Sequence, residues 1–243
     1  MSGHSKWANI KHKKGKTDAL KAKVTTKISR EITVAVRMGG SDPTGNMRLK
    51  LALQKARENN ITKDNIQRAI QKGAGASDTS NYVEITYEGY GPGGVAVRVE
   101  AMTDNKNRAA ADVRHAFTKQ GGNMGESGCV AWMFTSKGIF VVSKEGHDED
   151  ELTLLALDAG AEDLKVEDDA FEIYTTPEEF DAVEAALAEA NIETEVAKIT
   201  MMPDNYIELS GEDAVKMQKM LDALDDLDDV QDVYHNAILP EEE

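Results

Sequence analysis

The sequence predicts an α+β multidomain protein, in which an N-terminal three-helix domain precedes two ferredoxin-like α+β sandwiches, one inserted into the other. Apolar residues follow a helical repeat as far as residue 73, and from Val83 they alternate with a period of two, which is typical of strands. The charge changes at the same place. Residues 1–80 hold 17 Lys and Arg and 6 Asp and Glu, a net of +11, whereas the remainder holds 11 and 38, a net of −27. A basic helical part and an acidic strand-rich part therefore meet near Ser80.

The basic part begins with residues 3–16, which show no sustained hydrophobic period and are predicted to form an extended arm. Thr17 or Asp18 is expected to cap a first helix that ends at Gly39–Gly40. Its basic residues fall on a different sector from its apolar stripe, so they form either a solvated face or a binding face. The apolar stripe consists of Leu20, Val24, Ile28, Ile32 and Ala35, and the basic sector of Lys23, Lys27, Arg30 and Arg37.

Two shorter helices are expected next. Asp42 as N-cap and Pro43 at the first helical position are typical of a helix start, so the second helix is expected to run from there to Asn59–Asn60. Thr62 is expected to cap a third helix that ends at Gly73. Together the three helices predict a small helical domain.

The acidic part is predicted to contain the β-α-β-β-α-β order twice, once from Ile139 onward and once in the elements on either side of that unit. Residues 89–94 lie between two alternating segments and lead into a strand. A phosphate-binding glycine loop must lead into a helix, so a hairpin connection is favoured. Asn107 is expected to cap the next helix. The expected strands cover 83–87, 95–101, 129–134, 139–142, 164–166, 170–174, 193–199, 206–209 and 230–235, and the expected helices 107–120, 149–159, a segment after 176–177, and 212–225.

Three domains follow from this order. The arm and three-helix domain are assigned to 1–80, a discontinuous α+β sandwich to 81–136 and 203–243, and an inserted ferredoxin-like domain to 137–202. No run approaches the roughly 18 apolar residues of a membrane span, and the N-terminus lacks the apolar core of a signal peptide, so a cytoplasmic location without a membrane partner is expected.

No arrangement of residues predicts a catalytic or metal site, so no enzyme activity, cofactor or small-molecule substrate is expected. The serines lack a nucleophile elbow, and the histidines lack ligand spacing. The acidic run at 147–151 lies before and within the first turn of a helix, where acids favour the helix dipole, so a solvated helix start is preferred over a cation site. Cys129, the only cysteine, is expected to be a small core residue.

The arm is the strongest candidate for a binding site. Residues 3–16 contain five lysines, two histidines, one tryptophan and no acid. Lysines placed near phosphates release condensed counterions, so such a segment is typical of a polyanion contact. Trp7 either stacks on a base or holds the arm against the helical domain. Contacts with nucleic acid are expected at Lys6, Trp7, Lys11, His12, Lys13, Lys14, Lys16, Lys23, Lys27 and Arg30.

Several motifs resemble those of the YebC family, which includes the mitochondrial translational activator of cytochrome c oxidase subunit I. The resemblance covers nearly the whole chain, and its motifs are at the spacing of that family. They are the opening residues 1–14, the helix that begins at Asp18, and the segments 39–43, 59–60, 87–94 and 103–108. The resemblance implies the same three-domain layout and a regulator of gene expression.

Family members are described both as DNA-binding transcriptional regulators and as ribosome-associated factors that relieve stalling on proline-rich nascent chains. The hypothesis of a ribosome-associated factor, with rRNA or tRNA as partner, is preferred because no helix clearly presents Arg, Asn and Gln to a major groove. Promoter DNA stays the alternative. A protein-interaction scaffold is a third possibility, and it would require full function without the arm. The loop formed by Gly39, Gly40, Ser41, Asp42 and Pro43 is a candidate functional loop, although the sequence alone favours a simple helix connection.

Overall fold

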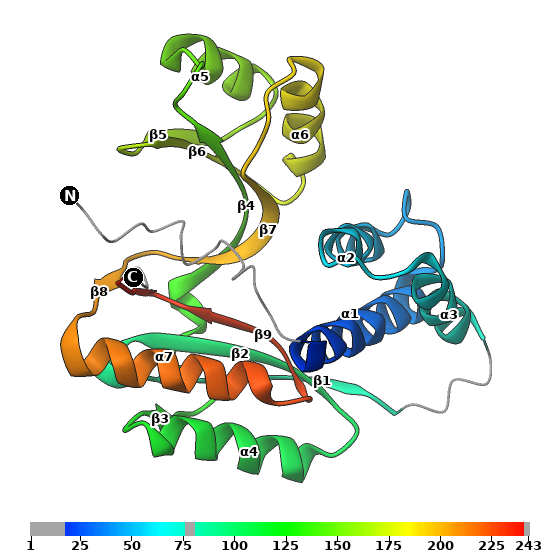
Figure 1. Cartoon of the computed structure of the whole chain (residues 1–243), viewed down its shortest axis with the longest axis vertical. Helices are drawn as coiled ribbons and strands as arrows, with labels where there is room; N and C mark the ends of the chain where they lie inside the picture. The colour runs from blue at the N-terminus through cyan, green and yellow to red at the C-terminus, as the bar shows by residue number, and fades with distance from the viewer. Residues whose placement is uncertain (1–17, 76–80, 241–243) are drawn as a thin grey trace.

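The computed structural model describes residues 18–75 and 81–240, and it shows a helical unit beside two α+β sandwiches (Figure 1). The helical unit contains α1 (Asp18–Gly39), α2 (Met47–Glu58) and α3 (Lys63–Ala74). Its core is built by the apolar stripes predicted from the helical repeat, so the three-helix prediction is confirmed. Completely or nearly completely buried members are Ile28, Ile32, Ala35, Leu49, Ala52 and Ala56.

The start of α2 differs from the prediction. Its N-cap is Asn46, whose side chain accepts a hydrogen bond from the Leu49 amide at 3.1 Å. Asp42 instead closes a local turn. Its Oδ1 accepts one hydrogen bond from the backbone amide of Thr44 at 2.9 Å and one from the Thr44 hydroxyl at 2.7 Å. Asp42 and Asn46 are both good capping residues. Only Asn46 also reaches the end of α1, which decides where α2 begins.

Gly73 does not end α3 as predicted, since the helix continues to Ala74 and Gly75 is the C-cap. Gly73 is buried against α1, and a Cβ atom there would lie 2.4 Å from the carbonyl oxygen of Thr33. The Thr33 hydroxyl donates to the Ala69 carbonyl at 3.2 Å in the same contact. The glycine therefore permits close helix packing rather than a change of chain direction.

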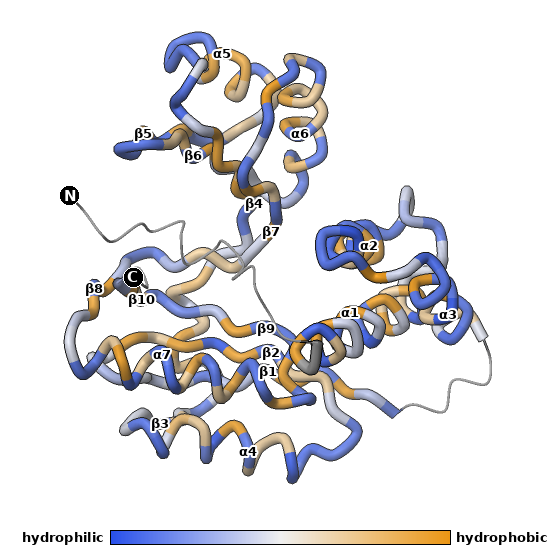
Figure 2. Tube along the Cα trace, viewed as in Figure 1, coloured by the Kyte–Doolittle hydropathy of each residue, from blue (hydrophilic) through white to orange (hydrophobic). Residues whose placement is uncertain are grey.

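The first sandwich, here called the host sandwich, has a four-stranded sheet in the order β3-β1-β2-β9. Its strands are β1 (Val83–Tyr90), β2 (Ala96–Thr103), β3 (Asn123–Met124) and β9 (Val230–His235). Strands β1 and β2 form the predicted hairpin, with a short 3-10 turn, η1 (Pro92–Gly94), between them. Helices α4 (Lys106–Lys119) and α7 (Gly211–Asp226) cover one face and close the core (Figures 1 and 2). The N-cap of α4 is Asn105 and not Asn107.

The inserted sandwich has the predicted ferredoxin-like order. Its elements are β4 (Phe134–Ser143), α5 (Glu149–Asp158), β5 (Asp163–Val166), β6 (Ala170–Thr175), α6 (Phe180–Glu189) and β7 (Val196–Pro203). The antiparallel sheet order is β5-β6-β4-β7, which is the ferredoxin-like arrangement. Helices α5 and α6 pack on one face, where Phe140 stacks on Phe180 with ring centroids 4.7 Å apart. The α+β fold class is thus confirmed.

Two predicted strands of the host sandwich lie elsewhere. Residues 129–133 form a turn and a 3-10 helix, η2 (Ala131–Met133), that leads directly into β4. The predicted strand at 206–209 is the two-residue β8 (Ile207–Glu208), which pairs with β10 (Ala237–Ile238) in a separate two-stranded sheet. The first segment is apolar because Val130 and Met133 pack at the junction between the sandwiches, and the second because Ile207 and Leu209 pack on the core of the host sandwich. Apolar content alone therefore does not define a strand.

His235 at the end of β9 is expected to make stability depend on pH. Its Nδ1 accepts a hydrogen bond from the Ala237 amide at 3.1 Å, and burial lowers its pKa to about 4. Because the folded-state pKa lies below the usual value near 6.5, the neutral ring stabilises the fold above pH 6.5, and that contribution falls between about pH 6.5 and 4. The total is at most about 3 kcal/mol.

We expect His235→Gln to flatten the pH dependence of the unfolding free energy in this range, measured by urea titration at several pH values. The matched control is His115→Gln, which changes an exposed histidine on α4. Equal slopes for the wild type and both variants would contradict the assignment.

Candidate nucleic-acid interface

Seven of the predicted nucleic-acid contacts belong to the N-terminal arm and lie outside the described residues: Lys6, Trp7, Lys11, His12, Lys13, Lys14 and Lys16. They stay predictions. The other three, Lys23, Lys27 and Arg30, lie on one side of α1. The structure brings these three together on residues 225–229, here called the α7–β9 connection, which start in the last turn of α7 and carry Asp225, Asp226, Asp228 and Asp229.

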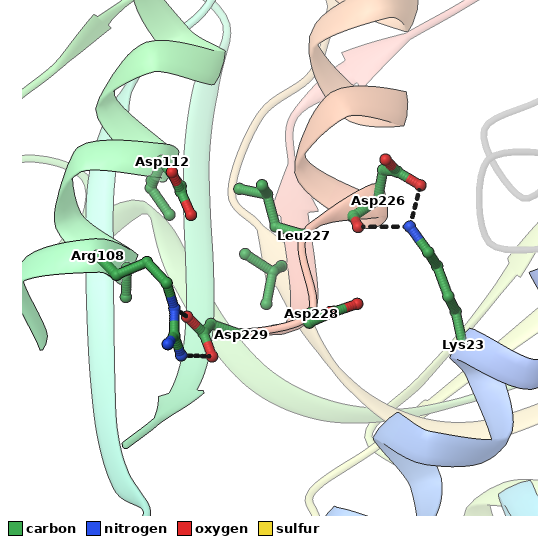
Figure 3. Close-up of a pocket in the computed structure, with 10 residues that line it drawn as sticks. Lys23, Arg108, Asp112, Asp226, Leu227, Asp228 and Asp229 are labelled. Atoms are coloured by element: carbon green, nitrogen blue, oxygen red, sulfur yellow. Dashed lines mark hydrogen bonds and ion pairs between the residues drawn. The ribbon is translucent and has the colours of Figure 1, made fainter. Parts of the chain in front are cut away.

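The two lysines bind the end of α7 directly. The Lys23 ammonium lies 2.6 Å from Asp226 Oδ1 and donates to the Asp226 carbonyl at 3.1 Å (Figure 3). The hydrogen bond to the Asp226 carboxylate raises the pKa of Lys23. Lys27 donates to the Asp225 carbonyl at 2.5 Å, and burial lowers its pKa. The last turn of a helix has unpaired carbonyl groups and negative potential, so cations are favoured there.

Arg30 is more enclosed than either lysine, with a side chain 14% exposed. Its Nη1 donates to the carbonyls of Met102 at 3.0 Å and Asp228 at 3.2 Å, and lies 3.8 Å from Asp229 Oδ1. The guanidinium also stacks 4.4 Å from the Tyr82 ring centroid. Arg30 therefore joins α1 to the host sandwich and is not presented to solvent.

Asp229 is the central acid of this contact. Its side chain is 8% exposed and accepts hydrogen bonds from Arg108 Nε and Nη2, both at 3.0 Å (Figure 3). Arg108 also donates to Asp104 at 2.8 Å. Arg108 and Asp229 border a pocket of about 220 Å³ between α1, α4 and the end of α7, which Lys23 and Asp112 also line. Both cations of this pocket are paired, Lys23 with Asp226 and Arg108 with Asp229, which suits an interdomain contact better than a ligand site.

Three of the four basic residues of α2, Arg48, Lys50 and Lys55, face the sandwiches too. Arg48 bridges Glu31 of α1, at 2.6 Å, and Glu84 of β1. Lys50 lies 2.6 Å from Asp181 of α6, in the inserted sandwich. Lys55 lies 3.3 Å from Asp232 of β9, whose charge raises the pKa of the lysine. Part of the positive charge of the helical unit is thus neutralised by acidic side chains of the same molecule.

The candidate functional loop is part of the segment 39–46, which connects α1 to α2 (Figure 1). This segment is exposed along most of its length and is held at its base by Asn46. The side-chain nitrogen Nδ2 of Asn46 donates hydrogen bonds to the backbone carbonyls of Ala35 and Gly40, both at 2.8 Å. A Cβ atom on Gly39 would lie 2.7 Å from Asn46 Nδ2, and Gly40 has a φ of 88°, so both glycines are needed. Sequence reasoning missed Asn46, whose signal was a second capping residue four positions after Asp42.

A second set of cations also escaped sequence reasoning. Arg57, Lys63, Arg68 and Lys72 are exposed at the end of α2 and along α3, and within the described part of the chain they have no ion pair or hydrogen-bonded side-chain partner. For Lys63, Arg68 and Lys72 the signal was available, because the helical repeat places them outside the apolar stripe of α3.

The fold and these contacts define a multidomain α+β protein whose cation-rich helical unit docks on acidic sandwiches. Family models match the TACO1/YebC protein N-terminal domain at residues 5–76 and the TACO1/YebC second and third domain at 82–237. The chain therefore belongs to the TACO1/YebC family, as the sequence motifs predicted.

Two relatives are named "Probable transcriptional regulatory protein". The one from Carboxydothermus hydrogenoformans is 56% identical over 239 residues, covering 97% of this chain and 98% of its own. The one from Desulfatibacillum aliphaticivorans is 54% identical over 242 residues, covering 100% and 98%. Among solved structures, a conserved hypothetical protein from Aquifex aeolicus matches with a TM-score of 0.81 and 46% identity, covering 98% of both chains.

Within the described ranges, no helix is both long and apolar enough to cross a membrane. The same ranges hold no group of three or more His, Cys, Asp and Glu side chains placed to bind a metal ion.

Proposed function

We propose that this protein is a nucleic-acid-binding regulator of gene expression that acts in the cytoplasm on the ribosome, where it relieves stalling on proline-rich nascent chains. It acts by binding and not as an enzyme, with rRNA or tRNA as its partner. The observation that carries this proposal is the exposed loop at 39–46, which Asn46 holds in one conformation at the end of the basic helical unit.

The charge distribution supports an oriented complex. Phosphates attract the arm and the helical unit, whereas the sandwiches, with a strongly acidic composition, are repelled and stay outside. A rigid loop beside the basic unit is then directed toward the nucleic acid. A narrow functional centre of the ribosome accepts a small polar loop better than a bulky domain.

DNA-binding transcriptional regulation is the second candidate. The names of the two relatives, both called probable transcriptional regulatory proteins, favour it. It predicts selective binding to a promoter sequence, whereas the ribosome proposal predicts binding to ribosomes irrespective of promoter sequence.

Replacing Ser41 with tryptophan tests the loop. Ser41 is exposed and does not have the positive φ of Gly40, so the variant should fold normally but fill the space the loop needs. In a reconstituted translation reaction on a proline-rich template, we expect relief of stalling to fall roughly ten-fold or more, on the order of 1.4 kcal/mol in binding.

Thr118→Trp is the control, because it adds the same bulk at an exposed position of α4. Full activity of Ser41→Trp would show that the loop is only a connection between two helices. If the wild-type protein also fails to relieve stalling, the proposed function on the ribosome is contradicted.

A further inference from the structure

The outward face of α3 exposes basic and amide side chains, a composition typical of a binding surface. Ile66, Ala69, Ile70 and Gly73 point into the helical unit and pack against its core. The opposite side exposes what we call the α3 face, formed by Lys63, Gln67, Arg68, Gln71 and Lys72. None of these five side chains forms a hydrogen bond or an ion pair with another residue of the described part of the chain.

The helix that carries this face is firmly positioned. Thr62 caps its first turn by accepting a hydrogen bond from the Asn65 amide at 3.3 Å. On the inward side, Gly73 allows α3 to approach the backbone of α1 at Thr33. A rigid support lowers the entropic cost of ordering side chains on binding.

The α3 face differs from the other basic surfaces of the helical unit in being free. Lys23, Lys27 and Arg30 are engaged by the α7–β9 connection, and Arg48, Lys50 and Lys55 of α2 pair with acids of the two sandwiches. Arg57 at the end of α2 is the exception, because its side chain is exposed and has no described partner. An external polyanion would have to displace those contacts. It can reach the α3 face without displacing anything that the structure describes.

The order of side chains around α3 matches a groove between two phosphate strands. At roughly 100° per residue, Gln67 and Gln71 lie between Lys63 on one side and Arg68 with Lys72 on the other. Asp64 is the one acid on this arc, where it lies between Gln71 and Arg68, and with it the arc has a net charge of +2. A cation at the first helical position is disfavoured by the helix dipole, so Lys63 is not explained by helix stability.

We propose that the α3 face binds the minor groove of an A-form RNA duplex. The two cationic edges contact phosphates of the two strands, and the central amides pair with 2′-hydroxyl groups, since both are donor and acceptor. The two cationic edges lie about half of the helix circumference apart, which places them on opposite sides of the amides. Arg and Gln on an exposed helix also contact base edges in the major groove of B-form DNA, so binding to DNA is the competing outcome of the test below. This inference rests on the proposed function and names a segment of double-helical rRNA as the contact.

The test compares full-length protein and variants for binding to a 20-base-pair RNA duplex, a DNA duplex of the same sequence, and purified ribosomes. Lys63→Gln/Arg68→Gln/Lys72→Gln should weaken RNA-duplex binding roughly ten-fold or more near physiological salt and flatten the salt slope by about two units. Gln67→Ala/Gln71→Ala should reduce the preference for RNA over DNA and leave the slope almost unchanged.

Lys106→Gln/Arg114→Gln/Lys119→Gln is the matched control, because it removes three exposed cations from α4 of the host sandwich. All variants change exposed side chains, and thermal unfolding checks that they fold. If both triple variants bind RNA like the wild type, the inference fails while ribosome binding by the wild type keeps the proposed function. A greater loss on DNA than on RNA would also overturn it. Wild-type protein that binds neither RNA nor ribosomes would contradict the proposed function and this inference together.

Discussion

Asp229→Ala is expected to lower the free energy of unfolding by about 3 kcal/mol, because it leaves two arginines of the interdomain contact without their shared carboxylate. Asp229 accepts both hydrogen bonds from Arg108 at 3.0 Å and lies 3.8 Å from Arg30. Arg30 is largely enclosed, so its charge cannot be fully hydrated after the carboxylate is lost. Arg108 is half exposed, which keeps the cost at the lower end for a broken buried pair.

Urea unfolding at neutral pH measures this effect, and Asp226→Ala is the matched control. Asp226 lies three positions earlier and also pairs with a cation of α1, but its side chain is 65% exposed. An exposed ion pair contributes about 0–1 kcal/mol. Equal destabilisation by the two changes would show that burial does not govern this contact.

Local sequence patterns predicted the helices and the inserted sandwich well. The apolar repeat of α1 identified the residues that form its buried face, including Ile28 and Ile32. The order of elements from Ile139 onward identified the ferredoxin-like arrangement, which the strand pairing confirms. These features depend on residues close in the chain, so a single sequence contains the information.

Errors arose where two neighbouring residues were equally suitable by local chemistry. Asn46 and not Asp42 caps α2, and Asn105 and not Asn107 caps α4. At Asn46 the choice depends on contacts with Ala35 and Gly40, which exist only after α1 and α2 pack together. Gly73 shows the same effect, since its role is set by the distance to Thr33 in another helix.

The partners of the α1 cations could not be predicted from the sequence. The periodicity correctly placed Lys23, Lys27 and Arg30 on one polar sector. It did not reveal that the α7–β9 connection, about two hundred residues later, covers that sector. A polar helix face is compatible with solvent, nucleic acid or an acidic surface of the same chain, and tertiary packing decides between them. Of the cations of the helical unit discussed above, those of the α3 face and Arg57 have no internal partner among the described residues.

Neutralising the arm is expected to have the largest effect on binding. If Lys6, Lys11, Lys13, Lys14 and Lys16 lie along phosphates, changing all five to glutamine should flatten the dependence of log affinity on log salt by roughly three units or more. Trp7→Ala should weaken binding with little change in slope, because stacking releases few counterions. Filter binding or anisotropy across a salt series measures both quantities.

The same experiment separates the ribosome from promoter DNA. At physiological salt, wild-type protein should bind ribosomes much more tightly than duplex promoter DNA, and the five-lysine variant should lose that preference. The α4 triple variant controls for a general change in net charge, because its cations belong to the host sandwich. Tight, sequence-selective promoter binding that survives high salt, combined with weak ribosome binding, would refute translation as the function. Transcriptional regulation would then be the better account, since salt-resistant selectivity requires contacts with base edges rather than with phosphates.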